Sequence, residues 1–571
     1  PGYLSKHRNR YHKHRNSKCN NRPAAFAYKR NVSTRPLKGR RIQQWQISIG
    51  KPVESTMNTP ENSLHFNLAE YLMQVNKDRL ERPAYFDSTG TLNYGQLFDR
   101  IRRQAAALKR LQLHREERVL LLMNDCTDWP VVFLGALYAG IVPVAVNTLL
   151  KPQDYRYMIE DSRCQAAYVS ASLLPVLTEA MDGVDHEIKH IVVSRPQAAL
   201  AHGHLCMEDT LQAATPCHRA CATKADEAAF WLYSSGSTGK PKGTVHSQAN
   251  PYWTMRYYAQ DLLHLSESDR ILSAAKLFFA YGLGNALTFP LSVGASVVLI
   301  EGRPTPDAVF AAMREHKPTI FCGAPTGYAG MLAAANTPTR DEVQLRMCSS
   351  AGEALPRELG ERFTAHFGCH IIDGIGSTEM LHIFLSNTPD DVRYGTTGKP
   401  VPGYELELRD EQGAIVADGE IGDLYIKGKS AALMYWNNRE KTQATFLGEW
   451  TKSGDKYSRD ANGYYTYAGR SDDMLKVSGQ YVSPFEVEAT LIEHEAVFEA
   501  AVIGVTDSQG LVKTKAYVVL KETAPAADDA LKETLKAFVK SRLAPHKYPR
   551  SIEFLDELPK TATGKIQRFR L

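Results

Sequence analysis

The sequence lacks the patterns that mark several common protein classes. Its nine cysteines are scattered, with no C-x-x-C pair and no spacing that indicates a disulfide framework. It contains no Gly-x-Ser-x-Gly motif, which disfavours a hydrolase built on a serine nucleophile. It shows no short-period repeat of the kind that builds solenoids. We therefore expect reduced thiols and an ordinary globular protein, too long at 571 residues for one hydrophobic core.

Positive charge is concentrated at the start of the chain. Residues 1–56 contain 14 Lys and Arg and one acid, so the net charge of +5 conceals a remainder with a net charge of −8. Low hydrophobicity without a helical or strand period predicts a basic, disordered leader there. We interpret residues 1–56 as non-native or as an artefact of start assignment, with an organelle transit peptide as the alternative. The mildly acidic remainder predicts no binding of nucleic acid.

Long uncharged runs are scarce, and only residues 277–300 need a membrane test. That run is long enough to span a bilayer. Three glycines, Asn285 and Pro290 interrupt it, which favours a buried helix followed by a buried strand. We therefore expect no membrane segment, and we expect a cytoplasmic protein.

Apolar runs of strand length alternate with helical patterns along most of the chain. A predicted strand at 119–123, a helix at 128–140 and a strand at 141–146 form one βαβ unit, and the pattern repeats. The last hundred residues are different, because two strands there precede an amphipathic helix at 529–543.

This change of pattern predicts two folded domains. The fold class is α/β: residues 57–471 form a large N-terminal domain with parallel βαβ-type sheets, and residues 472–571 form a small α+β C-terminal domain. Ligands often bind in the cleft between two such domains.

The first motif with chemical content runs from Tyr233 to Thr244 and reads YSSGSTGKPKGT. Glycines permit tight turns, and the backbone N–H groups, hydroxyls and two lysines can surround a polyphosphate. It is not a Walker loop, because only two residues separate Gly236 from Gly239-Lys240. The alternative is a flexible linker, which the lysines and the strand pattern before the motif make a poorer explanation.

Two further motifs combine glycine with acids or hydroxyls. The first, GIGSTE at 374–379, suits a phosphate contact from Thr378 beside a Mg²⁺ ligand, Glu379, although a capped helix start would also explain it. The second combines Asp455 with the run GRSDDMLKVSG at 469–479. A carboxylate there can bind ribose hydroxyls and an arginine can neutralise phosphate. A solvated turn is the alternative for the paired aspartates.

The fourth motif is PKTATGKIQR at 559–568. Taken alone it is a basic surface tail. It shows no helical or strand period, so any function would come from a loop that carries Lys565.

Together, in this order and at these separations, the four motifs resemble the adenylate-forming superfamily of acyl- and aryl-CoA ligases, carrier-loading adenylation domains and luciferases. The resemblance covers about residues 60–571. It implies Mg-ATP-dependent adenylation of a carboxylic acid, followed by transfer of the acyl group to coenzyme A.

The resemblance also implies residue roles. Thr378, Glu379 and Lys565 would be catalytic, with Glu379 the Mg²⁺ ligand. Asp472 would be the hinge of the small domain. The ATP-binding residues would be Ser234, Ser235, Gly236, Ser237, Thr238, Gly239, Lys240, Lys242, Gly352, Glu353, Ala354, Asp373, Thr378, Asp455, Arg470 and Lys565. The coenzyme A site would include Lys476, Ser478 and Gly479. Ile375 stands where the superfamily often has an aromatic residue, which weakens adenine stacking there.

Within the superfamily the sequence is most similar to benzoate-CoA ligases, through FFAYGLGN at 278–285, SAGEALP at 350–356 and GIGSTEMLHIF at 374–384. An aromatic acid needs a flat, apolar slot. The residues expected to line that slot are Ala280, Tyr281, Ala351, Gly374, Ile375 and His382. Core packing is the alternative role for residues 278–281.

Several alternatives stay open. Substituted benzoates and medium-chain fatty acids are possible substrates, because an apolar pocket rejects an added hydroxyl only weakly. A carrier-protein-loading enzyme would share every ATP motif, and an oxygen-consuming luciferase is not excluded. The expected partners are an aromatic carboxylate, ATP and coenzyme A, and superfamily habit favours a homodimer.

Overall fold

The computed structural model describes residues 59–234, 240–471, 473–477, 480–506, 512–544, 547–560 and 566–571. Residues 1–56, predicted as a leader, lie outside these ranges. The structural statements below apply to the described residues.

Seven strands from the first half of the chain and one later strand, β19, build an eight-stranded sheet with the order β19-β9-β8-β4-β3-β5-β6-β7. Its strands are β19 (Met434–Tyr435), β9 (Lys242–Ser247), β8 (Ala228–Ser234), β4 (Val142–Ala145), β3 (Arg118–Leu122), β5 (Ala166–Ser170), β6 (His190–Ser194) and β7 (His204–Cys206). The six neighbouring strands β8, β4, β3, β5, β6 and β7 are parallel to one another. At the other edge, β9 pairs antiparallel with β8, and β19 pairs antiparallel with β9.

Both faces of this sheet are covered, as apolar strands without alternation predict. Val119 and Leu121 belong to the core shared with α2 (Tyr94–Arg110) and α3 (Asp128–Ala139). Leu120 and Leu122 alternate with these residues along β3. They point to the other face of the sheet, where α4 (Pro152–Ser162) and α5 (Leu174–Met181) pack. Every residue of α3 is buried, so this helix lies inside the domain.

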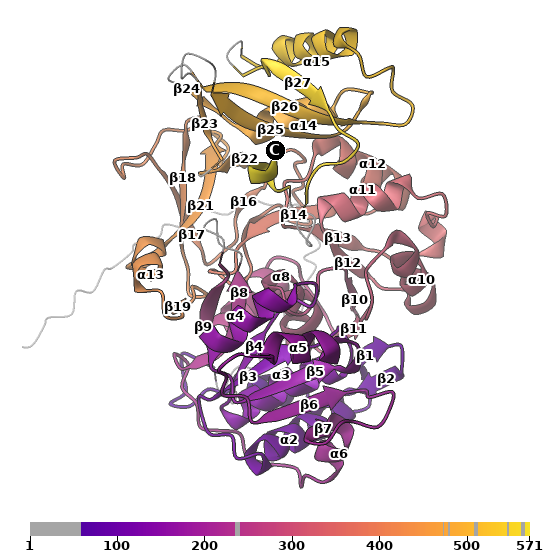
Figure 1. Cartoon of the computed structure of the whole chain (residues 1–571), viewed down its shortest axis with the longest axis vertical. Coiled ribbons are helices and arrows are strands. Elements are labelled where there is room, and N and C mark those ends of the chain that lie inside the picture. Colours follow the sequence, from indigo (N-terminus) through magenta and orange to yellow (C-terminus); the bar gives the residue numbers. More distant parts are fainter. Residues whose placement is uncertain are drawn as a thin grey trace, which may run out of the picture. The chain divides into compact units, whose positions relative to one another are not determined.

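A second, nine-stranded sheet has the order β16-β15-β14-β13-β12-β10-β11-β1-β2. Its strands are β16 (Lys399–Pro400), β15 (Ile383–Ser386), β14 (Ile371–Gly376), β13 (Met347–Ser350), β12 (Ile320–Gly323), β10 (Arg270–Ser273), β11 (Ser296–Val298), β1 (Pro83–Asp87) and β2 (Gly90–Asn93). From β14 to β1 neighbouring strands are parallel. Helices α10 (Pro306–His316), α11 (Pro325–Ala333) and α12 (Arg357–Phe367) cover one face of these strands (Figure 1).

Further helices and short helical turns lie outside these two sheets. They are α1 (Leu68–Val75), η1 (Ala171–Leu173), α6 (Met207–Gln212), α7 (Asn250–Thr254), η2 (Met255–Gln260), α8 (Ala280–Leu283), η3 (Gly284–Thr288), α9 (Phe289–Val293), η4 (Arg340–Glu342), α13 (Arg439–Thr445) and η5 (Arg568–Arg570).

Antiparallel strands follow in the sequence and position two of the predicted site residues. They are β17 (Glu405–Arg409), β18 (Ile421–Lys427), β21 (Trp450–Arg459), β20 (Phe446–Leu447) and β22 (Tyr465–Arg470). Asp455 on β21 is directly opposite Arg470 on β22 in this ladder.

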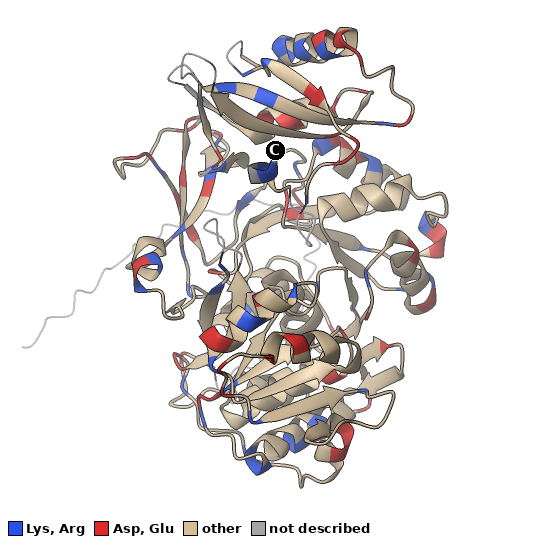
Figure 2. Ribbon diagram, in the orientation of Figure 1, with Lys and Arg blue, Asp and Glu red and all other residues tan. Residues whose placement is uncertain are grey.

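Residues 475–554 have an apolar core of their own. They form the hairpin β23 (Leu475–Val477) and β24 (Gln480–Val482), helices α14 (Pro484–Ile492) and α15 (Asp529–Arg542), and a three-stranded sheet of β25 (Val497–Thr506), β26 (Val512–Leu520) and β27 (Ser551–Phe554). Leu531, Leu535 and Val539 on α15 contribute to that core. The outer face of α15 carries both signs of charge side by side (Figure 2), with Lys532 paired to Asp529 and Lys536 to Glu533.

The uncharged run at 277–300 folds differently in detail from the prediction. It contains a buried helical segment and then β11, as expected, but the helical part is continuous from Ala280 to Val293 and includes a π-helical turn, η3. Pro290 does not break it and lies just after the π-helical turn, as the second residue of α9. No helix in the described part of the chain is long and apolar enough to cross a membrane.

Candidate active site

The predicted phosphate loop connects two antiparallel strands. Ser234 at the end of β8 is directly opposite Lys242 at the start of β9, so the ladder fixes both ends of the loop. Ser234 Oγ lies 3.5 Å from Thr244 Oγ1. Lys240 is exposed, with Nζ 5.2 Å from the centre of the Tyr157 ring. The ladder therefore places two lysines, Lys240 and Lys242, at the start of β9 or just before it.

Lys242, at the start of β9, lies close to Glu379. Lys242 Nζ is 4.0 Å from Glu379 Oε1, and both side chains are mostly buried. Tyr435 from β19 contacts both: its hydroxyl donates to Glu379 Oε1 at 2.7 Å, and Lys242 Nζ lies 4.4 Å from the centre of its ring. The first and second sequence motifs therefore come together around a tyrosine that no motif contains.

The second motif forms a turn between β14 and β15, and no helix begins there. A Cβ atom on Gly376 would approach His382 O to 2.5 Å, so this position requires glycine. Thr378 is held from its backbone, because its carbonyl oxygen is 2.8 Å from Nε2 of the buried His246 on β9. Burial lowers the pKa of His246 to about 4, so its imidazole is neutral near pH 7.

Asp455 and Arg470, the two ATP-binding residues expected from the third motif, form an ion pair. Arg470 Nη1 donates to Asp455 Oδ1 at 3.0 Å, and the Asp455 side chain is nearly buried whereas Arg470 is half exposed. The positive φ of Gly454 (+78°) turns the backbone before Asp455.

Four residues predicted to bind ATP, which the resemblance assigns to the adenine end of the nucleotide, lie after β13 and on β14. Gly352 has a φ of +95°, and Glu353 Oε2 accepts a hydrogen bond from Thr326 Oγ1 at 2.8 Å. Ala354 follows in the same loop. Asp373 on β14 is buried, which raises the pKa of its carboxyl to about 8. A carboxyl that keeps its proton at neutral pH can donate a hydrogen bond.

An aromatic and polar cluster surrounds the residues predicted to bind the acid. The rings of Tyr281 and His382 lie 5.5 Å apart, and His382 Nε2 is 3.3 Å from Tyr281 O. The Tyr281 hydroxyl donates to Ser349 Oγ at 2.9 Å. Burial lowers the pKa of His382 to about 3, and its Nδ1 is buried with no hydrogen-bond partner among the described residues.

The other members of the predicted slot lie nearby in the fold. Ala280 begins α8, Ala351 directly follows β13, and Gly374 and Ile375 lie on β14, next to the turn that leads to His382. A Cβ atom on Gly284 would approach His382 Cδ2 to 2.3 Å, so glycine there makes room for the imidazole.

Some predicted site residues lie outside the described ranges. These are Ser235, Gly236, Ser237, Thr238, Gly239, Asp472, Ser478, Gly479 and Lys565, together with the side chain of Lys476. Their roles stay predictions.

The segments that flank two of those positions are tied together. Arg568 Nη2 lies 2.7 Å from Glu488 Oε2, and Arg568 Nη1 lies 3.3 Å from Asp473 Oδ2. Glu488 is buried and also accepts from the backbone N–H of Val502 at 2.7 Å. Lys560 and Ile566 form an antiparallel bridge. The chain end is thereby fixed to the turn that follows residue 472.

The donor set around Glu379 fits Mg²⁺. A carboxylate oxygen is the ligand that Mg²⁺ prefers, and this ion usually binds one or two carboxylates together with substrate phosphates and water. Tyr435 occupies Oε1, whereas Oε2 accepts no hydrogen bond from the described residues. Glu379 would hold the ion with this second oxygen, next to the phosphate loop.

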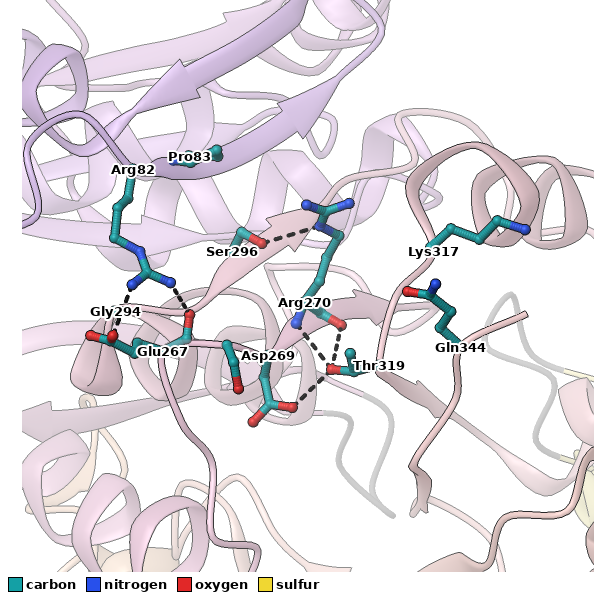
Figure 3. A pocket seen from close by; sticks show the side chains of 11 residues that line it. Arg82, Pro83, Glu267, Asp269, Arg270, Gly294, Ser296, Lys317, Thr319 and Gln344 are labelled. Carbon is teal, nitrogen blue, oxygen red and sulfur yellow. Dashed lines mark hydrogen bonds and ion pairs between the residues drawn. The ribbon is translucent and has the colours of Figure 1, made fainter. Parts of the chain in front are cut away.

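The structure also has a surface pocket of about 200 Å³ away from these motifs, drawn in Figure 3. Its charged residues are already engaged: Arg82 pairs with Glu267 at 2.9 Å, and Asp269 accepts from Thr319 Oγ1 at 2.8 Å. Arg270 reaches Ser296 Oγ at 3.3 Å. These contacts explain the polar lining as part of the fold around β10.

Sequence reasoning missed Tyr435, His246 and Ser349. Tyr435 is 56 residues from Glu379 and 193 from Lys242 along the chain, and it follows no recognisable motif. A sequence signal for His246 existed, since it follows the phosphate loop directly on β9.

Comparison with known proteins agrees with this geometry. The model of the AMP-binding enzyme family matches residues 72–436, and that of the AMP-binding enzyme C-terminal domain matches residues 486–565. A benzoate-CoA ligase from Thauera aromatica is 54% identical over 89% of this chain and 95% of its own. A 4-hydroxybenzoate-CoA/benzoate-CoA ligase from Rhodopseudomonas palustris is 46% identical over 86% and 90%.

A solved structure of a similar enzyme also matches this chain. A benzoate CoA ligase from Burkholderia xenovorans superimposes with a TM-score of 0.83 at 60% identity, covering 88% of this chain and 99% of that one. The residues that the two family models match include the phosphate hairpin, the Glu379 turn and most of the last hundred residues. The chain is therefore a member of the AMP-binding enzyme family, the adenylate-forming superfamily that its motifs resemble.

Proposed function

We propose that this protein is an ATP-dependent benzoate-CoA ligase that forms an acyl-adenylate and then an acyl-CoA thioester. The observation that carries the proposal is the meeting of Lys242, Glu379 and Tyr435 at the base of the phosphate hairpin, in a chain 54% identical to a benzoate-CoA ligase. The aromatic cluster around Tyr281 and His382 supports a flat acid as substrate.

In the first half-reaction a carboxylate oxygen of the acid attacks the α-phosphorus of ATP. The new bond joins oxygen to phosphorus, and the bond from that phosphorus to the bridging oxygen breaks, which releases pyrophosphate. Enzymes accelerate such steps mainly by positioning and by stabilising developing charge. Bound Mg²⁺ would neutralise part of the negative charge on the phosphates.

The protein's own residues have separate roles in this step. Lys240 and Lys242 would bind the outer phosphates, and Thr378 and Lys565 would contact the α-phosphate. Asp455 and Arg470 would hold the ribose. The paired geometry of Asp455 and Arg470 supports this role, because their contact at 3.0 Å orients the carboxylate before ATP arrives.

In the second half-reaction the thiolate of coenzyme A attacks the acyl carbon. A carbon–sulfur bond forms, the bond to the phosphate oxygen breaks, and AMP leaves. Rotation about Asp472 would exchange Lys565 for the segment at 476–479. The predicted domain division at residues 471 and 472 is part of this proposal.

The acid slot sets the range of substrates. Its buried His382 imidazole and the Tyr281 ring would favour benzoate, and the second relative's name, which includes 4-hydroxybenzoate, supports ring-substituted benzoates as further candidates. Medium-chain fatty acids and a carrier protein as acceptor are the competing proposals. A cytoplasmic location, for which the scattered cysteines are the argument, and a homodimer, which superfamily habit favours, complete the proposal.

The test is to measure pyrophosphate, AMP and thioester formation with Mg-ATP, coenzyme A and a panel of benzoates and fatty acids, for the wild type and for Lys565→Ala. We expect rapid benzoyl-CoA formation by the wild type. In the variant, adenylation should fall by about 10²–10³, whereas thioester formation from supplied benzoyl-AMP persists. Pyrophosphate release without a thioester would instead identify a carrier protein as acceptor.

A further inference from the structure

Tyr435 lies between the two charged residues of the phosphate site. Its side chain is 3% exposed, and its hydroxyl donates to Glu379 Oε1 at 2.7 Å. Lys242 Nζ lies 4.4 Å from the ring centre and 3.4 Å from the hydroxyl oxygen. Tyr435 therefore donates to the predicted Mg²⁺ ligand through its hydroxyl. It contacts a predicted phosphate-binding lysine through its ring and through the hydroxyl oxygen, which accepts a hydrogen bond from Lys242 Nζ.

The backbone holds Tyr435 in this place from several sides. β19 pairs with β9, and Tyr435 is opposite Thr244 in that ladder. The backbone N–H of Tyr435 donates to Thr442 Oγ1 at 3.0 Å. The N–H of Ala432 donates to Glu379 O at 2.8 Å, which fixes the two segments to each other. The tyrosine is thus preorganised relative to both partners.

The direction of the hydrogen bond is settled by electrostatics. An ionised carboxylate can only accept a hydrogen bond, so the phenol of Tyr435 is the donor. A hydrogen bond to one oxygen of a carboxylate fixes the rotation of the group. Glu379 Oε2 is then directed to one position.

We propose that Tyr435 is a positioning residue for Mg²⁺: it orients Glu379 as a single-oxygen ligand and holds Lys242 beside it by a cation–π contact. The inference rests on the proposed function for the identity of the nucleotide. Residues that orient a metal ligand in this way typically contribute about 10–100-fold to metal affinity or activity. The cation–π contact would keep Lys242 near the ligand before the phosphates arrive.

A binding experiment without acid or coenzyme A tests this. Calorimetry would measure the affinity for α,β-methylene-ATP, whose α–β linkage cannot be cleaved, with Mg²⁺ and with EDTA. For Tyr435→Phe we expect about tenfold weaker binding with Mg²⁺ and less than about twofold change in EDTA, because the ring stays beside Lys242 and only the hydrogen bond from Lys242 Nζ to the hydroxyl is lost. The catalytic activity of Tyr435→Phe should also be reduced, and raising the Mg²⁺ concentration should restore part of it.

The chain offers a matched control. Tyr464 also donates to a carboxylate, Asp391, at 2.6 Å and 2.8 Å, and has Arg393 and Lys399 within 4.2 Å of its ring centre. It lies outside the proposed site. Tyr464→Phe should leave both affinities unchanged. A change in this control would reveal a general effect of removing a buried phenol.

The outcomes separate the possibilities. Equal weakening with and without Mg²⁺, or no weakening, would overturn the inference. Should Tyr435→Phe not fold, Thr442→Val loosens the backbone anchor of Tyr435 and should give a smaller loss of the same metal-specific kind; a metal-independent loss would contradict the proposal. A wild type that binds the Mg-nucleotide but makes no benzoyl-CoA would refute the proposed function and leave this inference intact.

Discussion

Two buried histidines differ from surface histidines in their protonation. His246 and His382 have pKa values of about 4 and about 3, both lowered chiefly by burial from an ordinary 6.5. Both are therefore neutral at the pH where acyl transfer would occur. A rate profile should then show no step near pH 6.5 from either imidazole.

The same shifts make stability depend on pH. Between about pH 3 and 6.5 the unfolded chain binds a proton at residue 382 that the folded protein does not, so the free energy of unfolding falls as the pH drops through this window. His382→Leu removes that titration. We expect its unfolding free energy to decline less steeply from pH 6.5 to 4 than that of the wild type, measured by urea titration. Parallel curves would contradict a buried, neutral His382.

At the scale of elements, the π-helical turn η3 places Gly284 against His382. A Cβ atom there would lie 2.3 Å from the imidazole and 3.0 Å from the Phe289 ring. π-helical turns often occur at functional sites. Here the turn brings a backbone position without a side chain to the predicted acid slot.

Gly284→Ala should therefore disturb both packing and substrate binding. Overpacking typically costs about 1–3 kcal/mol of unfolding free energy, and we expect a higher KM for benzoate because the imidazole must move. Gly327→Ala on α11 is the control, since its Cβ would meet nothing within 4 Å. That change should be neutral or stabilise by up to about 1 kcal/mol. Similar melting temperatures for the two variants would refute the steric argument.

The elements also show which features of a sequence predict structure. The apolar runs predicted β3, α3 and β4 to within about two residues, because a buried parallel strand needs consecutive apolar side chains. The π-helical turn was not predictable, since its geometry depends on the contact between Gly284 and His382. The sequence motifs include Lys242, Glu379, Asp455 and Arg470. They do not include Tyr435, because only the folded chain brings this residue next to Glu379 and Lys242.

At the scale of the whole molecule, residues 475–554 have a core separate from that of the two large sheets. Arg568 joins this unit to the turn at Asp473 through its pairing with buried Glu488. Both ends of the small unit therefore meet at one ionic cluster. Such a link would let the segments flanking residues 472 and 565 move together.

Arg568→Gln should destabilise this unit selectively. The change leaves Glu488 buried without its cation, which typically costs about 3–5 kcal/mol. Hydrogen exchange should quicken in β25 and β26 while β3 and β5 keep their protection. Arg542→Gln is the control, because Arg542 and Glu493 are 46% and 58% exposed, and removal of their pair should change stability by less than about 1 kcal/mol. Uniform loss of protection in both units would show that they unfold as one.

The order of strands in the nine-stranded sheet has a consequence for synthesis. β1 pairs with β11, and Tyr85 is opposite Val297, roughly 210 residues later in the chain. At about 5–20 residues per second, a ribosome would need roughly 10–40 s to supply that partner. Throughout this interval β1 and β2 would have no strand to join on that side. The nascent chain should therefore depend on chaperones during translation more than a protein whose neighbouring strands follow one another in sequence.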